Sequence, residues 1–396
     1  MDAAELREVL SAEGLRLLDD VGPIDSTADV VRIVSRLRAE GHGGGLVAAV
    51  LGQARLRAKA VAKFGDFAAR MLFTPDGLEQ ATRLRVAAMH AGRFAEAGVD
   101  VVADLGCGIG ADSLAFAALD LGVLAIERDE VTAAIATYNL APFPSARVEL
   151  GDAETTDLTG VGGVWLDPAR RSEGRRLDDP ADWSPSLDWA FGIARERPTG
   201  IKLGPGLDRD LIPDDCEAQW VSVDRDVVEL ALWFGETARP GVGRAALVVS
   251  DAGITELTAE ADSPDAEAGE LGRYLLEPDG AVIRARLIGD LARRVGGTML
   301  DPTIAWITTD EQPDTPFGQA FRVVERFPLD VKTLKRELGT RDIGVLEIKK
   351  RGVDIDPAAF RTKLGLRGSQ SATLVLTRVS GDRVALLCER VASLVE

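Results

Sequence analysis

The sequence contains few of the residues on which common metal, disulfide and nucleophile sites depend. Its three cysteines, Cys107, Cys216 and Cys388, are far apart and odd in number, so they make neither a disulfide framework nor a metal site. Its two histidines, His42 and His90, fall in no metal-ligand or catalytic-triad pattern. We therefore expect no metal centre and treat both histidines as structural.

Long apolar runs are also missing. No stretch reaches the roughly 18 residues that a membrane span requires, and the acidic start over residues 1–6 has no basic and then apolar signal pattern. Hydrophobic residues make up 46% and charged residues 28% of the 396 positions, the balance of a soluble globular protein. The sequence predicts a cytoplasmic protein of two or three domains with no membrane contact.

Positive charge is scarce overall. A net charge of −18 argues against unselective nucleic-acid binding, which needs many cations to neutralise phosphates, and we expect no DNA partner. The charge is uneven, however, because residues 322–367 hold 12 Lys and Arg against 7 Asp and Glu. Such a patch fits a selective polyanion binder or ordinary solvated helix faces, and charge alone leaves both readings open.

The chain divides by pattern into three parts. Residues 1–95 have apolar positions at helical spacing with breaks at 41–45 and 73–77, which predicts a helical cap on the central domain. Residues 96–250 alternate short apolar strands with helices, the pattern of a mostly parallel α/β sheet. Residues 251–396 begin with an acidic linker or short exposed helix and continue as a separate α+β domain.

Seven strands are expected in the central sheet. They are 100–104, 122–126, 146–150, 163–167, 200–203, 227–234 and 244–249, and a helical pattern over 78–97 precedes them. Only a Gly/Pro turn separates the last two, which favours an antiparallel hairpin at the end of the sheet. In the last domain we expect strands at 305–308, 320–325, 344–348, 371–379 and 383–388, with helices at 330–338 and 356–364.

The strongest chemical signal is Asp-Leu-Gly-Cys-Gly-Ile-Gly-Ala-Asp over 104–112, which follows an apolar strand and opens a helix over 113–119. Glycines at this turn let the backbone approach a ligand closely, at the strand end where α/β sheets bind ligands. A dinucleotide site would show Gly-x-Gly-x-x-Gly, whereas here Gly-x-Gly-x-Gly follows an acid that suits a cation. We therefore favour S-adenosylmethionine, with its cationic amino group and sulfonium. The loop residues assigned to it are Asp104, Gly106, Cys107, Gly108, Gly110 and Asp112.

Two further acids extend this cofactor site. Glu127 ends the second strand, 23 residues after Asp104, where an acid can bind both ribose hydroxyls. Asp152 follows the third strand, where it would bind the adenine amino group or, equally well, act as a helix N-cap. The neighbouring Arg128 and Ala153 are assigned to the same site.

The segment Asp-Pro-Ala-Arg-Arg over 167–171 ends the fourth strand and resembles the Asp/Asn-Pro-Pro-Tyr motif of class I methyltransferases. In those enzymes the acid or amide and the next carbonyl hold the target amine, and a nitrogen nucleophile needs orientation more than a strong base. Ala169 here replaces the second proline and Arg170 the aromatic residue, so nothing aromatic follows to stack a flipped base. We expect Asp167, Pro168 and Arg170 to be catalytic.

The arginines of this motif have a second interpretation. Arg170 and Arg171 suit a phosphate or carboxylate of the substrate, and we assign Arg171 to substrate binding. The alternative for Arg170 is an ion pair with a local acid, Asp178 or Asp179. Lys202 ends the fifth strand on the same rim and either lines the site or only snorkels to solvent.

Covalent catalysis is disfavoured. It needs a cysteine nucleophile near the site, but Cys107 is inside the cofactor loop and Cys388 is in the far C-terminal part. Cys216 is flanked by acids that would raise its pKa. We therefore expect non-covalent, in-line methyl transfer.

Beyond the loop, the whole chain resembles one family, the bacterial class I methyltransferases with a C-terminal THUMP-like domain. The matching stretches are 57–64, 78–82, 104–112, 166–171, 276–280, 346–352 and 368–373. The resemblance implies a Rossmann-like seven-stranded sheet and three domains at 1–95, 96–250 and 251–396. It also implies that Glu79 and Gln80, a polar pair expected to be buried, fold over the cofactor.

The resemblance implies RNA as the partner, because THUMP domains in other proteins deliver RNA, often tRNA, to an attached modification enzyme. Lys349, Lys350 and Arg351 form a compact cationic turn suited to phosphate contacts. The expected function is methylation of a base nitrogen of tRNA or rRNA. Two alternatives stay open: a small-molecule methyltransferase with the C-terminal domain as a lid, which the acidic charge favours, and a non-catalytic module that binds the cofactor or RNA.

Overall fold

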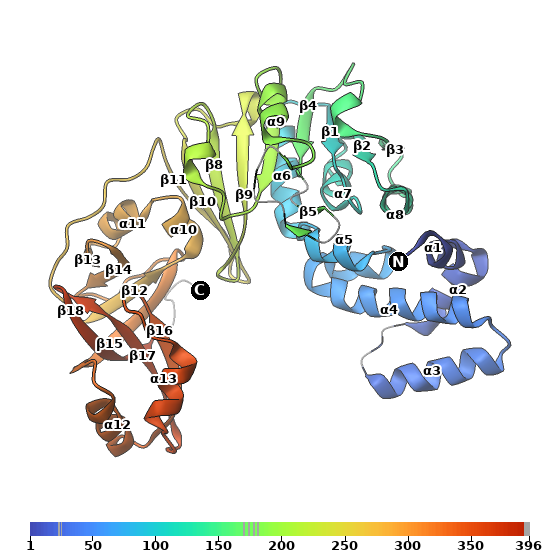
Figure 1. The fold of residues 1–396 in the computed structure, drawn as a ribbon. Coiled ribbons are helices and arrows are strands. Elements are labelled where there is room, and N and C mark those ends of the chain that lie inside the picture. Colours follow the sequence, from blue (N-terminus) through green and yellow to red (C-terminus); the bar gives the residue numbers. More distant parts are fainter. Residues whose placement is uncertain are drawn as a thin grey trace. The chain divides into compact units, whose positions relative to one another are not determined.

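The chain folds into two compact units (Figure 1). The computed structural model describes residues 1–396 except Pro23, Asp25, Ala169, Arg170, Glu173, Gly174, Leu177, Asp178, Pro180, Ala181 and 392–396. One unit comprises Met1–Lys202 and Trp233–Ala238, and the other comprises Leu203–Leu232 and Arg239–Glu396. In the described part of the chain, every helix is too short or too polar to cross a membrane.

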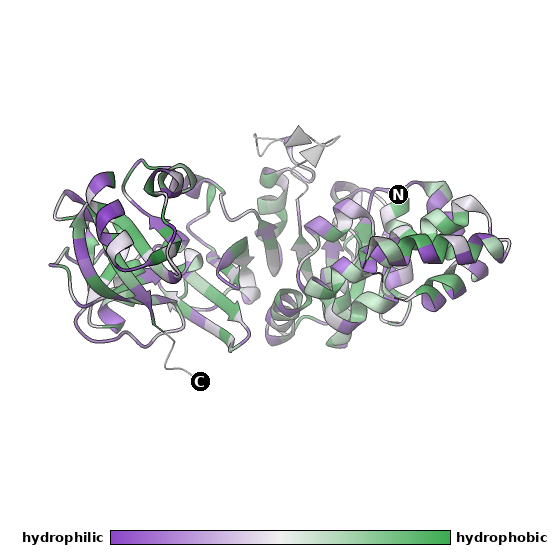
Figure 2. Cartoon of the chain, turned by 90° about the horizontal axis from the view of Figure 1, so that it is seen from below, coloured by the Kyte–Doolittle hydropathy of each residue, from purple (hydrophilic) through white to green (hydrophobic). Residues whose placement is uncertain are grey.

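Helices form the N-terminal part of the first unit. They are α1 (Ala3–Leu10), α2 (Ala12–Val21), α3 (Thr27–Ala39), α4 (Gly44–Phe64), the 3-10 helix η1 (Gly65–Arg70), α5 (Pro75–Gln80) and α6 (Leu84–Glu96). Helices α1, α2 and α3 gather around α4 (Figure 1). Hydrophobic and hydrophilic residues are interspersed along these helices (Figure 2), as expected of helices that bury one side. The predicted break at 41–45 is confirmed between α3 and α4.

The single helical pattern predicted over 78–97 is wrong, because two helices cover it. Thr74 caps the start of α5 by accepting a hydrogen bond from the Gly77 amide, and Ala81 and Arg83 then adopt extended backbone. The ammonium of Lys63 donates to the carbonyls of Leu78, Glu79 and Ala81, at 2.9, 2.6 and 2.8 Å. These carbonyls lack helical partners, so the lysine stabilises the end of α5.

Two buried amide side chains fasten the helical part to the sheet. Gln53 of α4 exchanges two hydrogen bonds with the backbone of Phe73. Asn139 exchanges two with Leu72 and donates a third to the carbonyl of Ile109, in the loop after β1. Because a buried polar group is costly to leave unpaired, these bonds fix the segment before α5 against the loop after the first strand.

The main sheet is Rossmann-like, as predicted, and its order is β11-β10-β8-β9-β7-β4-β1-β2-β3. Its strands are β1 (Val101–Leu105), β2 (Gly122–Glu127), β3 (Ala146–Leu150), β4 (Gly163–Leu166), β7 (Thr199–Leu203), β8 (Glu217–Val223), β9 (Asp226–Phe234), β10 (Arg244–Ser250) and β11 (Gly253–Ala259). Strands β3, β2, β1, β4 and β7 pair in parallel, so their carboxyl ends meet at one edge. The connecting segments hold α7 (Ala111–Ala118), α8 (Glu130–Leu140), η2 (Ala153–Thr155), β5 (Arg171–Ser172), β6 (Arg175–Arg176), α9 (Leu187–Ala194), η4 (Arg209–Leu211) and η5 (Gly235–Thr237).

Two strands of this sheet were not expected, and they change the predicted end of the sheet. The prediction of an antiparallel hairpin between 227–234 and 244–249 is wrong. The second of these segments is β10, which lies between β11 and β8 and runs parallel to β8. Strand β8 was not predicted because its polar residues interrupt the apolar pattern by which the other strands were recognised. Glu217 pairs with Arg239, and Gln219 donates to Glu256 of β11. In the acidic segment predicted as a linker or exposed helix, Gly253–Ala259 instead forms β11, antiparallel to β10, whereas residues 260–270 contain no helix or strand.

The second unit also contains a seven-stranded sheet. Its order is β13-β14-β12-β15-β18-β17-β16. The strands are β12 (Tyr274–Pro278), β13 (Thr298–Asp301), β14 (Ile304–Thr309), β15 (Gly318–Pro328), β16 (Ile343–Lys350), β17 (Gln370–Val379) and β18 (Asp382–Arg390); the helices are α10 (Gly280–Arg284), α11 (Ile288–Arg294), α12 (Val331–Thr340) and α13 (Pro357–Leu364). Leu334 and Leu338 of α12 and Phe360 and Leu364 of α13 share one buried core with β15–β18. The predicted α+β character and both predicted helices are confirmed.

Candidate active site

The loop after β1 is built on three left-handed glycines. Gly106, Gly108 and Gly110 have φ values of 89°, 55° and 83°, a region that strains any residue with a Cβ. The amides of Gly106 and Cys107 donate to the carbonyl of Ile126 at 2.9 and 3.0 Å. The loop is thus held against the end of β2, and Gly110 caps α7.

Glu127, at the end of β2, closes this loop from the other side. Its Oε2 accepts from the Gly108 amide at 3.1 Å and its Oε1 from the Asp129 amide at 2.8 Å. Exposed Arg128 donates to the hydroxyl of Ser184 at 2.8 Å. The Cys107 thiol is buried, and burial raises its pKa well above the usual value. Cys107 therefore offers the loop its backbone rather than a thiolate.

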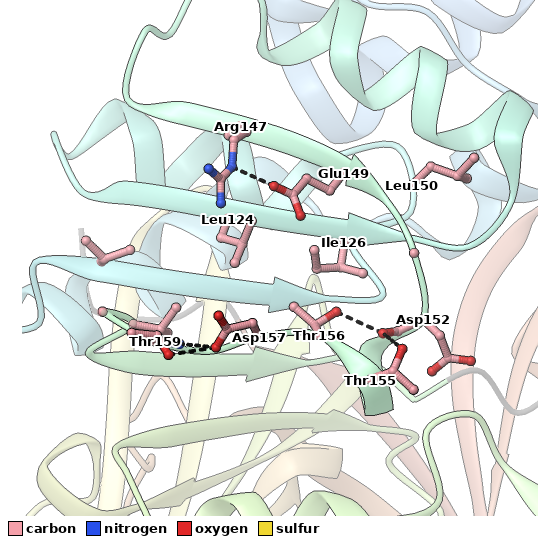
Figure 3. A pocket seen from close by; sticks show the side chains of 14 residues that line it. Leu124, Ile126, Arg147, Glu149, Leu150, Asp152, Thr155, Thr156, Asp157 and Thr159 are labelled. Atoms are coloured by element: carbon pink, nitrogen blue, oxygen red, sulfur yellow. Dashed lines mark hydrogen bonds and ion pairs between the residues drawn. The ribbon is translucent and has the colours of Figure 1, made fainter.

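Asp152 lies at the margin of a pocket on the face of β1, β2 and β3 (Figure 3). Its carboxylate caps η2, which includes Ala153, by accepting from the Glu154 amide at 2.9 Å. The pocket, of about 500 Å³, is lined by Leu124 and Ile126 and reaches Asp152. Residues 106–110 are absent from its described lining. We therefore regard it as a separate hollow of the sheet face and not as the space beside the glycine loop.

Asp167 follows β4 directly and lies against the cofactor loop. Strand β4 pairs with β1 so that Leu166 is opposite Leu105. A Cβ added to Gly106 would have the carbonyl oxygen of Asp167 as its nearest neighbour, at 3.5 Å. Pro168 is buried beside it. The parallel register therefore brings the two predicted motifs together at one edge of the sheet.

Lys202 of β7 pairs with Asp167. Its Nζ is 2.5 Å from Asp167 Oδ2, and the lysine side chain is only 13% exposed. Strand β7 lies beside β4 with Ile201 opposite Leu166, which places Lys202 next to the motif. A lysine that is so little exposed and pairs with Asp167 does not extend into solvent, and its assignment to the site stays a prediction.

The ion pair continues into a buried series of hydrogen bonds. Lys202 donates to the hydroxyl of Thr82 at 3.0 Å, and that hydroxyl donates to Asp112 Oδ2 at 2.7 Å. His90 Nδ1 lies 2.8 Å from Asp112 Oδ1, and its ring centroid is 4.2 Å from that of Trp165. We call Asp167, Lys202, Thr82, Asp112 and His90 the relay series. It connects the segment after β4 to α6 in the helical part of the first unit.

The relay series determines the charge of two buried acids. Burial by itself raises the pKa of Asp112, but His90, Lys202 and Thr82 outweigh it and leave the pKa below its usual value. Burial, followed by the charge of Asp112, raises the pKa of Asp104 to about 8. The Ser113 hydroxyl donates to Asp104 at 2.5 Å. At neutral pH Asp112 is therefore ionised, whereas the neighbouring Asp104 is largely protonated.

Sequence reasoning missed Thr82, His90 and Lys63. Lys63 holds the carbonyls just before Thr82; its burial, followed by the charges of Arg83 and Lys202, lowers its pKa to about 8. Thr82 and Lys63 do fall in stretches that resemble the family, so that signal was present. His90 is a lone histidine on a helix, and its contact with Asp112 becomes visible only in three dimensions.

Two predicted residues, Glu79 and Gln80, have a different setting, and two others, Arg170 and Arg171, are wholly or partly undescribed. Glu79 and Gln80 end α5 and are exposed, so the expectation of a buried polar pair is wrong; the residue of this stretch that enters the interior is Thr82. Arg170 lies outside the described residues, and so does its alternative partner Asp178. Arg171 begins the short strand β5, which pairs with β6, and its side chain is likewise outside the description.

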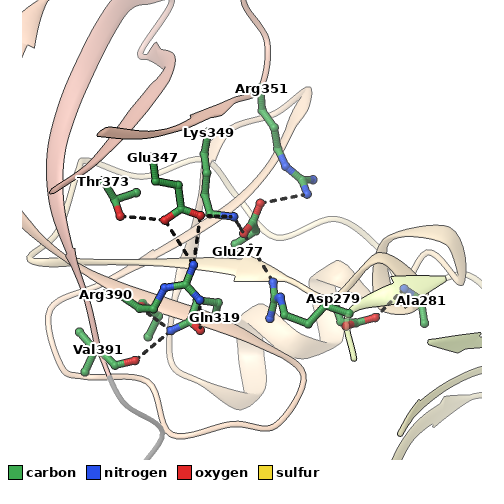
Figure 4. Close-up of polar contacts among 12 residues, drawn as sticks. Glu277, Asp279, Ala281, Gln319, Glu347, Lys349, Arg351, Thr373, Arg390 and Val391 are labelled. Carbon is green, nitrogen blue, oxygen red and sulfur yellow. Dashed lines mark hydrogen bonds and ion pairs between the residues drawn. The ribbon is translucent and has the colours of Figure 1, made fainter. Parts of the chain in front are cut away.

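The expected cationic turn in the second unit is partly neutralised (Figure 4). Lys349 and Arg351 both approach Glu277, at 2.8 and 3.8 Å. Lys349 and Lys350 are the last residues of β16, so only Arg351 lies in the turn itself. The prediction that all three cations lie in a turn is therefore wrong, and their role in phosphate contacts stays a prediction; Lys350 is exposed and Arg351 half-buried.

The chain has relatives over most of its length. Two uncharacterized S-adenosylmethionine-dependent methyltransferases of Mycobacterium tuberculosis, from strains CDC 1551 / Oshkosh and ATCC 25618 / H37Rv, are 34% identical over 339 residues. That is 83% of this chain and 92% of each relative. A family model described as THUMP domain-like matches residues 318–390, and one described as a domain of unknown function (DUF8688) matches residues 2–60.

A solved structure shares the fold. The crystal structure of a candidate methyltransferase from Porphyromonas gingivalis W83 aligns with a TM-score of 0.72 at 19% identity, over 93% of this chain and 100% of that chain. The two Mycobacterium tuberculosis relatives set the non-catalytic alternative aside, and the cofactor is S-adenosylmethionine. The chain belongs to the S-adenosylmethionine-dependent methyltransferases and carries a THUMP-like domain at its C-terminal end.

Proposed function

We propose that this methyltransferase modifies a base nitrogen of RNA, either tRNA or rRNA. The observation that carries the proposal is the approach of the Asp167 carbonyl to Gly106 of the cofactor loop. A target amine held by Asp167 would be next to any ligand of that loop. Because methyl transfer is an in-line displacement, this proximity supplies much of the rate.

The loop and its surroundings fit S-adenosylmethionine. Gly106 and Gly108 are partly exposed and can admit a ligand close to their backbone, and Glu127 is anchored by two backbone amides at the ribose position. We assign ribose binding to Glu127, adenine binding to Asp152 and Ala153, and the methionyl end to Asp104, Asp112 and residues 106–110. In this proposal Arg128, Glu79 and Gln80 border the cofactor. S-adenosylmethionine, when bound, supplies an electrophilic methyl group.

The chain's own residues orient and hold the acceptor. In this proposal Asp167 accepts a hydrogen bond from the target amine and Lys202 holds the carboxylate in one orientation. A covalent route through cysteine is disfavoured further, because burial raises the pKa of Cys216 to about 12. Nitrogen methylation then needs no cysteine nucleophile, only a positioned lone pair. Arg170 and Arg171 are assigned to an acidic group of the acceptor.

RNA is favoured as the acceptor class by the THUMP-like match over 318–390. In the proposed division of labour, 1–95 caps the cofactor, 96–250 performs the transfer and 251–396 binds RNA. The net charge of −18 favours a small-molecule acceptor instead, so the experiment includes one.

The test supplies radiolabelled methyl donor to three acceptor pools: small RNA, ribosomal RNA and a metabolite extract. Label in an RNA pool that depends on Asp167 supports the proposal. Asp167→Ala is the test variant, and Asp188→Ala, an exposed acid of α9, is the matched control. Label in metabolites alone would contradict RNA as the acceptor and make the C-terminal domain a lid.

A further inference from the structure

A second pocket, within the second unit, is lined by arginines. It has a volume of about 590 Å³, and Arg209, Arg284, Arg286 and Arg351 contribute to its wall. Its other described lining residues include no acid. A volume of several hundred Å³ is typical of ligand sites. In a chain of net charge −18, four arginines around one hollow point to an anion.

The carboxylates at the margin of this pocket do not balance its cations. Asp262 is shared by Arg209, at 2.6 Å, and Arg244, at 2.8 Å. Glu277 is shared by Lys349, Arg225 and Arg351, the last at 3.8 Å (Figure 4). Within the described residues, Arg284 and Arg286 have no carboxylate partner.

Two of the arginines are held in place before any ligand arrives. Arg209 donates to the carbonyl of Arg284 at 2.7 Å, and Arg284 donates to the carbonyl of Pro205 at 2.8 Å. The guanidinium of Arg209 also lies 5.3 Å from the ring centre of buried Trp220. Such preorganisation lowers the entropy that binding would cost. Each guanidinium retains N–H donors that can reach into the pocket.

Arg286 has a backbone conformation that favours glycine. Its φ is 60°, directly after the capping residue of α10, and the Leu287 amide donates to the carbonyl of Val282 at 3.0 Å. This is a helix C-terminal motif in which the left-handed position is usually glycine. A long cation there is strained and is directed at the pocket wall, which is the pattern expected of a functional position.

We propose that this arginine pocket binds a phosphate group of the RNA acceptor. The inference rests on the proposed function and deepens it by naming where the second unit contacts the RNA. Planar guanidinium groups match phosphate oxygens in paired hydrogen bonds. Among the described residues of the wall the aromatic one is Trp220, which is only 2% exposed and does not offer a face to a base. The pocket therefore positions RNA without reading its sequence.

The test measures binding of a fluorescein-labelled, single-stranded 12-nucleotide RNA to the full chain by anisotropy at several salt concentrations. Arg286→Gly removes the cation and the backbone strain together, so the variant is expected to fold. Loss of one charge-assisted contact should weaken binding about tenfold. The double variant Arg284→Ala, Arg286→Gly should reduce the salt slope by about 0.7, because the pocket neutralises one phosphate and each phosphate contact on single strands contributes about 0.7. Arg36→Ala, an exposed arginine of α3, is the control and should leave the slope unchanged.

Inorganic phosphate and uridine monophosphate, added at matched ionic strength, identify the source of the phosphate. The proposal is supported if RNA binds far more tightly than either small molecule and if the double variant binds RNA more weakly than the wild type. Equal affinity for RNA and free phosphate overturns RNA as the ligand of this pocket. RNA binding that is unchanged in the double variant overturns the pocket and leaves the proposed function standing. A wild-type chain that binds none of the RNA contradicts the proposed function itself.

Discussion

The two charged regions of this molecule differ in how completely their charges are matched. In the relay series of the first unit, Asp167 pairs with Lys202, and Asp112 is bonded to Thr82 and His90. In the arginine pocket of the second unit, cations share too few carboxylates. A closed network fixes its members in one geometry, whereas an open one leaves donors for a ligand.

This difference suggests separate roles. The relay series holds an acid in position at the edge of the sheet, where orientation determines the rate of methyl transfer. The arginine pocket offers charge, which determines affinity and its dependence on salt. Variants of the first region should therefore change turnover, and variants of the second should change binding.

Asp167→Ala should have the largest effect. Loss of an acceptor-orienting group should lower kcat by about 10²–10³, comparable to removal of one preorganised contact at other active sites. Its affinity for S-adenosylmethionine should change less than about threefold, because no contact with the loop is removed. Single-turnover methyl transfer and equilibrium dialysis give the two quantities. A parallel loss of cofactor affinity would contradict the assignment of Asp167 to the acceptor.

His90→Phe should destabilise the first unit by about 3 kcal/mol, because it leaves Asp112 buried with one partner fewer. The ring keeps its place beside Trp165 and Trp233, so indole fluorescence can follow unfolding in urea. In the double variant with Asp112→Asn the added cost of losing His90 should be much smaller. Additive losses in that double variant would show that the two residues act independently.

The sequence predicts the loop and its strands well, because three closely spaced glycines after an apolar strand have few other uses. Glu127 and Asp167 were located by their places at the ends of strands. The relay series could not be found in that way, since Lys202 reaches Thr82 across 120 positions of the chain. Strand β8 was missed for a similar reason, because Glu217 looks polar in sequence and is neutralised only by Arg239 in the fold.

The raised pKa of Asp104, about 8, predicts a pH-dependent cofactor affinity. Below pH 8 the free enzyme holds a proton on Asp104, whereas a cationic ligand favours the ionised form. The Kd for S-adenosylmethionine should therefore fall about tenfold between pH 6.0 and 7.0, because the ionised fraction of Asp104 rises about tenfold for each pH unit below its pKa. Asp104→Asn should bind weakly with a flat profile, as measured by isothermal titration calorimetry. A wild-type profile that is equally flat would show that Asp104 does not meet the cation.

The raised pKa of Asp104 also affects the stability of the unliganded fold, which should fall as the pH rises. The folded-state pKa of Asp104 is raised above the value of 3.8 in the unfolded chain. Its contribution to stability is therefore fully present below pH 3.8 and is lost as the pH rises through 8. Asp104→Asn removes this dependence, so the melting temperatures of wild type and variant should diverge toward pH 8. A saturating concentration of the cofactor should reverse that divergence in the wild type.

Arg286→Gly should have the smallest effect on the fold, and it should stabilise the protein, whereas His90→Phe destabilises it. Relief of a left-handed φ of 60° should stabilise the second unit by about 1 kcal/mol. Arg286→Ala removes the same guanidinium but keeps the strained backbone, so it should bind RNA as weakly as the glycine variant without the gain in stability. Differential scanning calorimetry separates the two. Equal melting temperatures of the two variants would show that the turn is unstrained. A difference in RNA affinity between the two variants would show that the backbone and not the cation contacts the ligand.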